Sequence, residues 1–216
     1  MPIILLIRHG ENDFLKQGRL PGRLEGVHLN DKGRQQAEEL VKTLAAAPIK
    51  AIYSSPLDRT VETAAPLAAA RGLDVIPRDG LLELDCGDWA GLTLKSLRRR
   101  SLWKTVQNRP SMMRFPNGES FGECQQRLAR ELEAICTLHR PGDVVACFSH
   151  SDPIKLAIAY FTGIPLDLFQ RLIVAPASIS TLMMGDGQAQ LINLNALAGF
   201  DFPQPPKKKP VKKAGS

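Results

Sequence analysis

Three short, almost wholly apolar runs most limit what this chain can fold into. They span Ile3–Ile7, Ala51–Tyr53 and Val144–Phe148. A strand with one solvent-exposed face alternates apolar and polar residues, whereas a parallel strand covered by helices on both faces is apolar throughout. The runs therefore predict buried parallel strands. None approaches the roughly 18 residues that would cross a bilayer, so we expect no membrane association.

Helical patterns separate and follow these runs. They cover Asp31–Ala47, Leu57–Arg71, Phe121–Arg140 and Pro153–Thr162. Asn30 and Ser120 stand where a capping side chain is expected, and Gly163 stands where a helix commonly ends. Strands that alternate with helices predict an α/β protein in which mostly right-handed crossovers join parallel strands.

A second group of strands is predicted to complete the sheet. Ile179–Met184 and Gln190–Asn195 flank Gly185-Asp186-Gly187, a pattern typical of an antiparallel hairpin. Val75–Pro77 is predicted as another short strand. We therefore expect a three-layer sandwich, with a mostly parallel central sheet, helices on both faces and an antiparallel edge.

The length and composition are those of a globular protein with one domain. The chain has 216 residues, 44% of them hydrophobic, and we expect that domain over residues 1–202. Residues 91–118 lack a clean periodicity apart from a short helix expected near Leu94–Arg100, so they are expected to form an insertion or lid. Residues 203–216 are rich in proline and lysine, which predicts a disordered tail.

The net charge of +6 comes mainly from that tail. Five lysines and no acid lie in it, and without it 23 Lys and Arg residues face 22 Asp and Glu residues. A nucleic-acid-binding domain carries its positive charge on one face of the folded body, so we expect no nucleic-acid partner. Met1–Ile7 is too short, and lacks the basic start, to be a secretory signal. We expect the protein in the cytoplasm.

The four cysteines lie far apart in the sequence. They are Cys86, Cys124, Cys136 and Cys147, and no two form a C-x-x-C pair. This spacing argues against a zinc ribbon and against a dense disulfide framework. We expect reduced thiols, most of them buried.

Polar residues follow each of the three apolar runs. The first run leads directly to Arg8 and His9, and the third leads to His150 and Ser151. The middle run leads through a turn into a helix that carries Arg59 near its start. The carboxyl ends of parallel strands meet at one edge of a sheet, where ligands bind, and a helix start favours an anion. Each residue alone could be structural, but two arginines and two histidines at one edge indicate a functional anion site.

Six motifs follow one another in an order that points to a known family. They lie at residues 6–11 (LIRHGE), 29–37 (LNDKGRQQA), 54–64 (SSPLDRTVETA), 83–91 (ELDCGDWAG), 116–120 (PNGES) and 148–150 (FSH). On these motifs the chain resembles the histidine phosphatase superfamily, in its phosphoglycerate mutase-like branch, over residues 3–194. The resemblance is specific for the superfamily and much less so for the substrate.

The resemblance implies catalytic roles for five residues. His9 is expected to attack phosphorus and form a phosphohistidine, for which its ring must be unprotonated. Arg8 and Arg59 hold the phosphoryl oxygens and disfavour an imidazolium by like-charge repulsion. By the same resemblance, His150 donates hydrogen bonds to the phosphoryl group, and Glu83 protonates the leaving oxygen before it takes a proton from the acceptor. No metal ion is required, and none is expected.

Two departures from the family pattern bear on substrate binding. Where mutases place an asparagine six residues after the nucleophile, this chain has Leu15, and Asn12 is expected to take over that contact with the substrate. After His150 the family usually has glycine, but here Ser151 and Asp152 follow. We expect Ser151 to bind substrate together with the arginines and His150. Asp152 is interpreted as a helix cap, with repulsion of a second acidic group or binding of a substrate hydroxyl as the alternative.

The leading function expected from the sequence is a phosphomonoesterase that hydrolyses a small phosphorylated metabolite through phospho-His9. The alternative is a phosphoglycerate mutase or related phosphomutase, the only case in which 2,3-bisphosphoglycerate would be needed, as a primer. Residues 91–118 are shorter than the matching region of typical mutases, which favours the phosphatase. A silent binding module is disfavoured, because all five catalytic positions are filled.

Arg98, Arg99 and Arg100 are interpreted as a solvated face rather than a second anion site. The family makes a homodimer a reasonable expectation.

Overall fold

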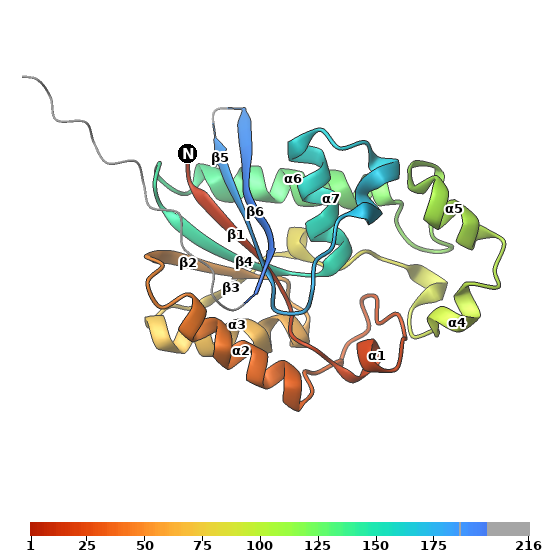
Figure 1. The fold of residues 1–216 in the computed structure, drawn as a ribbon, viewed down its shortest axis with the longest axis horizontal. Helices are drawn as coiled ribbons and strands as arrows, with labels where there is room; N and C mark the ends of the chain where they lie inside the picture. The colour runs from red at the N-terminus through yellow and green to blue at the C-terminus, as the bar shows by residue number, and fades with distance from the viewer. Residues whose placement is uncertain (186, 198–216) are drawn as a thin grey trace, which may run out of the picture.

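The computed structural model describes residues 1–185 and 187–197, and one six-stranded sheet organises them (Figure 1). The strand order across the sheet is β3-β2-β4-β1-β5-β6. The strands are β1 (Ile3–Arg8), β2 (Ile49–Ser54), β3 (Val75–Pro77), β4 (Val144–Ser149), β5 (Ile179–Gly185) and β6 (Gln188–Ala196). The first four are parallel to one another, and β5 and β6 add an antiparallel edge. The predicted fold class is therefore confirmed.

Helices cover both faces of the sheet. The longer ones are α2 (Asp31–Thr43), α3 (Asp58–Arg71), α6 (Phe121–Thr137) and α7 (Ser151–Thr162). Figure 1 shows α2 and α3 on one side of the strands and α6 and α7 on the other. Because side chains of a strand alternate between faces, β1 sends Ile3, Leu5 and Ile7 into a core with α2 and α3. Ile4 and Leu6 enter a second core with α6 and α7.

The register of the parallel strands sets the position of the polar residues that follow them. Arg8 at the end of β1 lies opposite Ser149 at the end of β4, and Ser54 at the end of β2 lies opposite Phe148. The three strands thus end at nearly the same level. The residues that come next along each strand are therefore delivered to one edge, as the sequence predicts.

Helix ends differ from the predicted ones by a few residues, for local reasons. Helix α2 ends at Thr43 rather than Ala47. Pro48 accounts for the non-helical backbone of Ala47, the residue directly before it. Helix α6 ends at Thr137 rather than Arg140. Helix α7 begins two residues earlier than predicted, because a proline is tolerated in a first turn whose N–H groups have no helical partners.

The start of α7 corrects the interpretation of Asp152. His150 occupies the cap position, with φ −126° and ψ 169°, and Asp152 is already the second helical residue. Its carboxylate instead forms an ion pair with Lys155, one turn later, at 2.7 Å between Oδ1 and Nζ. Asp152 is therefore not the helix cap.

The segment predicted as an insertion packs into a third core cluster, which it shares with α6 and α7. It contains the expected short helix, α4 (Leu94–Leu97), and also α5 (Leu102–Asn108) and a 3₁₀ turn at Pro110–Met112, which the sequence pattern did not predict. Trp89, Phe115 and Phe121 anchor this part of the molecule, with ring centroids 5.2 and 5.3 Å apart in successive pairs. The four-residue helix α1 (Asp13–Lys16) and a 3₁₀ segment at Leu166–Arg171 were also not predicted. The predicted tail, residues 203–216, lies outside the described residues.

Candidate active site

The loop after β1 brings the first histidine to the edge of the sheet. The amide of Gly10 donates to Thr63 Oγ1 at 3.0 Å, and Thr63 in turn bonds the Arg59 carbonyl at 2.6 Å. A side chain at Gly10 would meet the Gly33 carbonyl oxygen at 2.7 Å, closer than real Cβ contacts allow. The glycine of the first motif therefore permits α2 to approach the loop, and Thr63 ties that loop to α3.

His9 is held with one ring nitrogen free. Its side chain is buried, and Nδ1 lies 2.7 Å from the Gly10 carbonyl oxygen. A carbonyl oxygen only accepts, so Nδ1 carries the hydrogen and Nε2 keeps its lone pair. Burial, followed by the nearby charges of Arg8 and Arg59, holds the pKa of His9 well below its usual range. The ring is neutral at physiological pH and can act as a nucleophile through Nε2.

Two arginines present unpaired donors around this ring. Arg8 Nη1 bonds the Val174 carbonyl and Arg59 Nη2 bonds the Gly22 carbonyl, each at 2.7 Å. Arg8 Nε, Arg59 Nε and Arg59 Nη1 are buried and have no hydrogen-bond partner among the described residues. Burial lowers the pKa of both guanidinium groups, but an arginine still carries its charge at neutral pH. Buried cationic donors without partners are costly, which indicates that an anion completes the site.

A second histidine and a carboxyl group complete the candidate site. The ring centroids of His9 and His150 are 5.2 Å apart, and His150 is fully buried. His150 Nδ1 lies 3.7 Å from Glu83 Oε2, and His150 Nε2 lies 2.9 Å from Ser55 Oγ. Burial first, then the cations Arg59 and Arg8, lower the pKa of His150 well below its usual value.

Glu83 is poised between its acid and base forms. Burial, and next the Asp152 carboxylate, raise its pKa to about 7, against the opposing pull of Arg59 and Arg8. Its side chain is only 15% exposed. A carboxyl group with this pKa can give up a proton and take one back near neutral pH.

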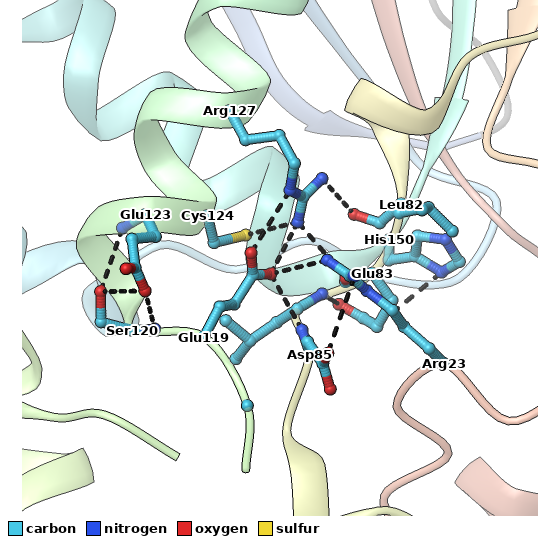
Figure 2. Close-up of polar contacts among 12 residues, drawn as sticks. Arg23, Leu82, Glu83, Asp85, Glu119, Ser120, Glu123, Cys124, Arg127 and His150 are labelled. Carbon is cyan, nitrogen blue, oxygen red and sulfur yellow. Dashed lines mark hydrogen bonds and ion pairs between the residues drawn. The ribbon is translucent and has the colours of Figure 1, made fainter. Parts of the chain in front are cut away.

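A charged network holds the chain at Glu83 in place, as Figure 2 shows. Arg23 Nε and Arg127 Nη2 donate to the Glu83 carbonyl oxygen at 2.8 and 3.3 Å. Glu119 Oε1 accepts from both arginines, at 3.1 and 2.7 Å, and from the Asp85 amide at 2.9 Å. Because Glu119 pairs with both cations and ties them to this backbone, the network sets the path of the chain that carries Glu83.

The sequence reasoning missed these supporting residues. Arg23, Glu119 and Arg127 were not singled out, although Glu119 lies in the PNGES motif. Ser55 and Thr63 also lie inside a recognised motif, where only Arg59 received a role. Their place in these motifs could have identified Ser55, Thr63 and Glu119, because a turn beside an anion site needs side chains that hold its geometry.

Asn12 and Ser151 were also predicted to bind substrate, and the structure gives them different surroundings. Asn12 is buried; its Oδ1 accepts from the Leu15 amide at 3.0 Å and so caps α1. Its Nδ2 has no partner among the described residues, which leaves it free to donate. Ser151 is partly buried in the first turn of α7. By contrast, the three consecutive arginines near residue 100 are exposed, and Arg100 lies over the Trp89 ring at 5.9 Å.

Cavities lie at both ends of the sheet. One of about 410 Å³ is lined by Arg23, Leu57, Asp58 and Leu82, which adjoin the catalytic positions. A larger one, of about 690 Å³, lies at the opposite end, where Met1, Tyr160 and Gln188 line it.

The described residues contain no cluster of three or more potential metal-ligating side chains. Nor does this part of the chain contain a helix long and apolar enough to cross a membrane.

The chain matches known proteins over most of its length. Phosphoserine phosphatase 1 of Hydrogenobacter thermophilus is 30% identical over 194 residues, which are 89% of this chain and 91% of that protein. The 2,3-bisphosphoglycerate-dependent phosphoglycerate mutase of Thermoplasma acidophilum is 29% identical, over 93% and 96% of the two chains. A phosphoserine phosphatase from Entamoeba histolytica, solved with phosphoserine bound, superposes with a TM-score of 0.82 at 25% identity, covering 91% of this chain and 98% of that one.

These similarities agree with the geometry of the site, in which Arg8, His9, Arg59 and His150 meet at one edge of the sheet. They also agree with the family model that matches residues 4–197, which is that of the histidine phosphatase superfamily, branch 1. The chain therefore belongs to branch 1 of the histidine phosphatase superfamily.

Proposed function

We propose that this chain is a metal-independent phosphomonoesterase that hydrolyses a small phosphorylated metabolite through a phosphohistidine on His9. The observation that carries the proposal is a neutral, buried imidazole with a free Nε2, near buried arginine donors that have no partner among the described residues. Family membership supports the general chemistry, and the relatives include both phosphatases and mutases.

The first half-reaction follows from the roles that the geometry allows. His9 Nε2 attacks phosphorus, and the bond between phosphorus and the ester oxygen breaks. The proton of the Glu83 carboxyl passes to the leaving oxygen, which departs as an alcohol. Arg8, Arg59 and His150 donate to the three remaining phosphoryl oxygens, where charge is spread in a loose transition state.

The second half-reaction returns the enzyme to its starting form. A water molecule attacks the phosphohistidine, and its proton passes to the Glu83 carboxylate as the phosphorus–nitrogen bond breaks. Inorganic phosphate leaves, and His9 is again neutral at Nε2. Glu83 must therefore be protonated in the first step and ionised in the second, and a pKa of about 7 serves both.

The charges beside the site favour hydrolysis of a monophosphate over a mutase reaction. A bisphosphate primer carries a second dianion, which needs its own cations. Arg23 is already paired with Glu119 at 3.1 Å, and Lys155 with Asp152 at 2.7 Å. The Asp152 carboxylate also acts on Glu83 and Arg8 through its charge, and so places a negative charge near the anion site. A second phosphate would therefore have to compete with Glu119 for Arg23 and with Asp152 for Lys155.

A substrate panel tests the proposal. Purified protein is incubated with phosphoserine, α-ribazole phosphate, sugar phosphates, and 3-phosphoglycerate with and without 2,3-bisphosphoglycerate. Free phosphate and isomer formation are measured in parallel, each with and without EDTA. We expect phosphate release without isomer, unchanged by EDTA. Isomer formation that exceeds phosphate release would identify a mutase, and EDTA-dependent loss restored by a divalent ion would overturn the metal-independent route.

A further inference from the structure

Ser55 touches the ring nitrogen of His150 that faces away from Glu83. Both residues are fully buried, and Ser55 Oγ lies 2.9 Å from His150 Nε2. Ser55 follows β2, and its amide donates to the Phe148 carbonyl of β4 at 2.9 Å. Its own carbonyl accepts from Ser54 Oγ at 2.8 Å and from Thr60 Oγ1 at 2.9 Å. The backbone of the turn is thus fixed from three sides, which fixes the position of the hydroxyl.

The hydrogen bonds around that hydroxyl determine the direction in which it donates. The Leu57 amide points at Ser55 Oγ from 3.5 Å, and the intervening Pro56 has no amide hydrogen. The oxygen already serves as an acceptor on that side. Among the described residues, the acceptor that remains for the hydroxyl hydrogen is His150 Nε2.

The tautomer of His150 follows from this donation. The ring is neutral in its cationic, desolvated surroundings, so it carries one hydrogen. If Nε2 accepts from Ser55, the hydrogen lies on Nδ1, which is 3.7 Å from Glu83 Oε2 and has no partner among the described residues. The opposite tautomer would leave the Ser55 hydrogen without an acceptor among the described residues. A buried polar hydrogen without an acceptor costs about 1–3 kcal/mol.

We propose that Ser55 is a positioning residue that fixes His150 as the Nδ1–H tautomer, so that a hydrogen-bond donor faces Glu83 and the bound phosphoryl group. The catalytic meaning of this inference rests on the proposed function, but the tautomer itself does not. The two histidines reach the same tautomer by opposite means. His9 donates its Nδ1 hydrogen to a backbone carbonyl, whereas His150 accepts a hydroxyl hydrogen at Nε2 and keeps Nδ1–H for the ligand.

Nitrogen NMR of histidine-labelled protein tests the tautomer directly. Long-range proton–nitrogen correlations distinguish a protonated from an unprotonated ring nitrogen, and a His150→Gln variant assigns the signals. In the unsubstituted protein we expect a protonated Nδ1 and an unprotonated Nε2 for His150. The reverse pattern would overturn the proposal without any measurement of activity, so its failure can be told apart from failure of the proposed function.

Substitutions test whether Ser55 is the cause. Ser55→Ala is expected to lose the single-tautomer pattern and to lower kcat by about 10- to 100-fold with little change in KM. This is less than the roughly 10²- to 10³-fold typical for loss of a donor itself, because Ser55 acts through His150. Ser55→Thr keeps the hydroxyl and should keep both the pattern and most of the activity. Ser180→Ala is the matched control, since that fully buried hydroxyl accepts from the Asn195 amide at the antiparallel edge of the sheet. An unchanged His150 tautomer in Ser55→Ala would overturn the proposal.

Discussion

The two ends of the sheet each hold a cavity and a histidine, yet their chemistry differs. At the carboxyl end, His9 and His150 are buried near Arg8 and Arg59, three of whose donor nitrogens have no partner among the described residues. At the amino end, His139 lies beside the larger cavity, and its Nε2 is bonded to Tyr53 Oη at 2.9 Å. The unpaired donors at the carboxyl end suit a bound anion, whereas His139 at the amino end already has a hydrogen-bond partner within the chain.

This difference teaches that strand direction, rather than cavity volume, locates the chemistry of this fold. The loops that follow parallel strands, and the amino ends of the helices after them, gather at one edge. Their N–H groups and the cations beside them favour a phosphate there. The cavity at the amino end is larger but lies at the other end of the same strands.

Replacing the histidines at the two ends gives the largest expected contrast. His9→Ala should abolish turnover and phosphoenzyme labelling, because no neighbouring group can replace the nucleophile. The matched control is His139→Ala, which should keep kcat/KM within about twofold. Labelling with a radioactive phosphate ester, followed by acid and base stability of the adduct, is the measurement. Labelling that persists in His9→Ala would remove His9 from its role.

Glu83→Gln should lower activity by an amount that depends on how much protonation the leaving group needs. An alkyl phosphate needs a proton on its departing oxygen, so kcat/KM should fall by ~10²- to 10⁴-fold. p-Nitrophenyl phosphate has a leaving group that needs little protonation, and its loss should be much smaller. Glu133→Gln, at the amino-end cavity, serves as the control for both esters. Equal losses on the two esters would argue that Glu83 does not act as the acid.

The pH profile should report the raised pKa of Glu83. Below its pKa of about 7 the carboxyl is protonated and can act as the acid, and above it the acid form is lost. For an alkyl phosphate, kcat/KM should therefore decline above about pH 7, approaching roughly tenfold per pH unit. Glu83→Gln should remove this decline. A wild-type profile that stays flat from pH 6 to 9 would contradict the assignment.

A substitution at the amino end should affect stability and spare catalysis. Phe161 lines the larger cavity and packs partly buried against the core that contains α6 and α7. Phe161→Ala should lower the free energy of unfolding by about 1–3 kcal/mol, less than for a fully buried phenylalanine. At 25 °C its kcat/KM should change by less than about twofold. A tenfold loss of activity in the folded variant would show that the two ends are coupled.

Removal of the lysine-rich tail is expected to have the smallest effect. Residues 203–216 lie outside the described part of the chain, and their five lysines attract anions only within a Debye length of about 8 Å. Truncation after Phe202 should change kcat/KM for a small phosphate ester by less than about threefold at physiological salt, or ~0.7 kcal/mol. Loss of tenfold or more would place the tail at the active site.

The sequence by itself determined the layers of the fold and the edge of the sheet that carries the candidate active site. Continuous apolar runs such as Ile3–Ile7 report burial on both faces, and strands that alternate with helices fix which ends meet. The hydrogen-bond partners of the site were decided by the tertiary structure, because they join residues far apart in the chain. Ser55 and His150 are 95 residues apart, and Arg23 and Glu119 are 96 apart. Local periodicity says nothing about such pairs. Likewise, whether Asp152 caps a helix or pairs with Lys155 depends on where the packed backbone starts to turn.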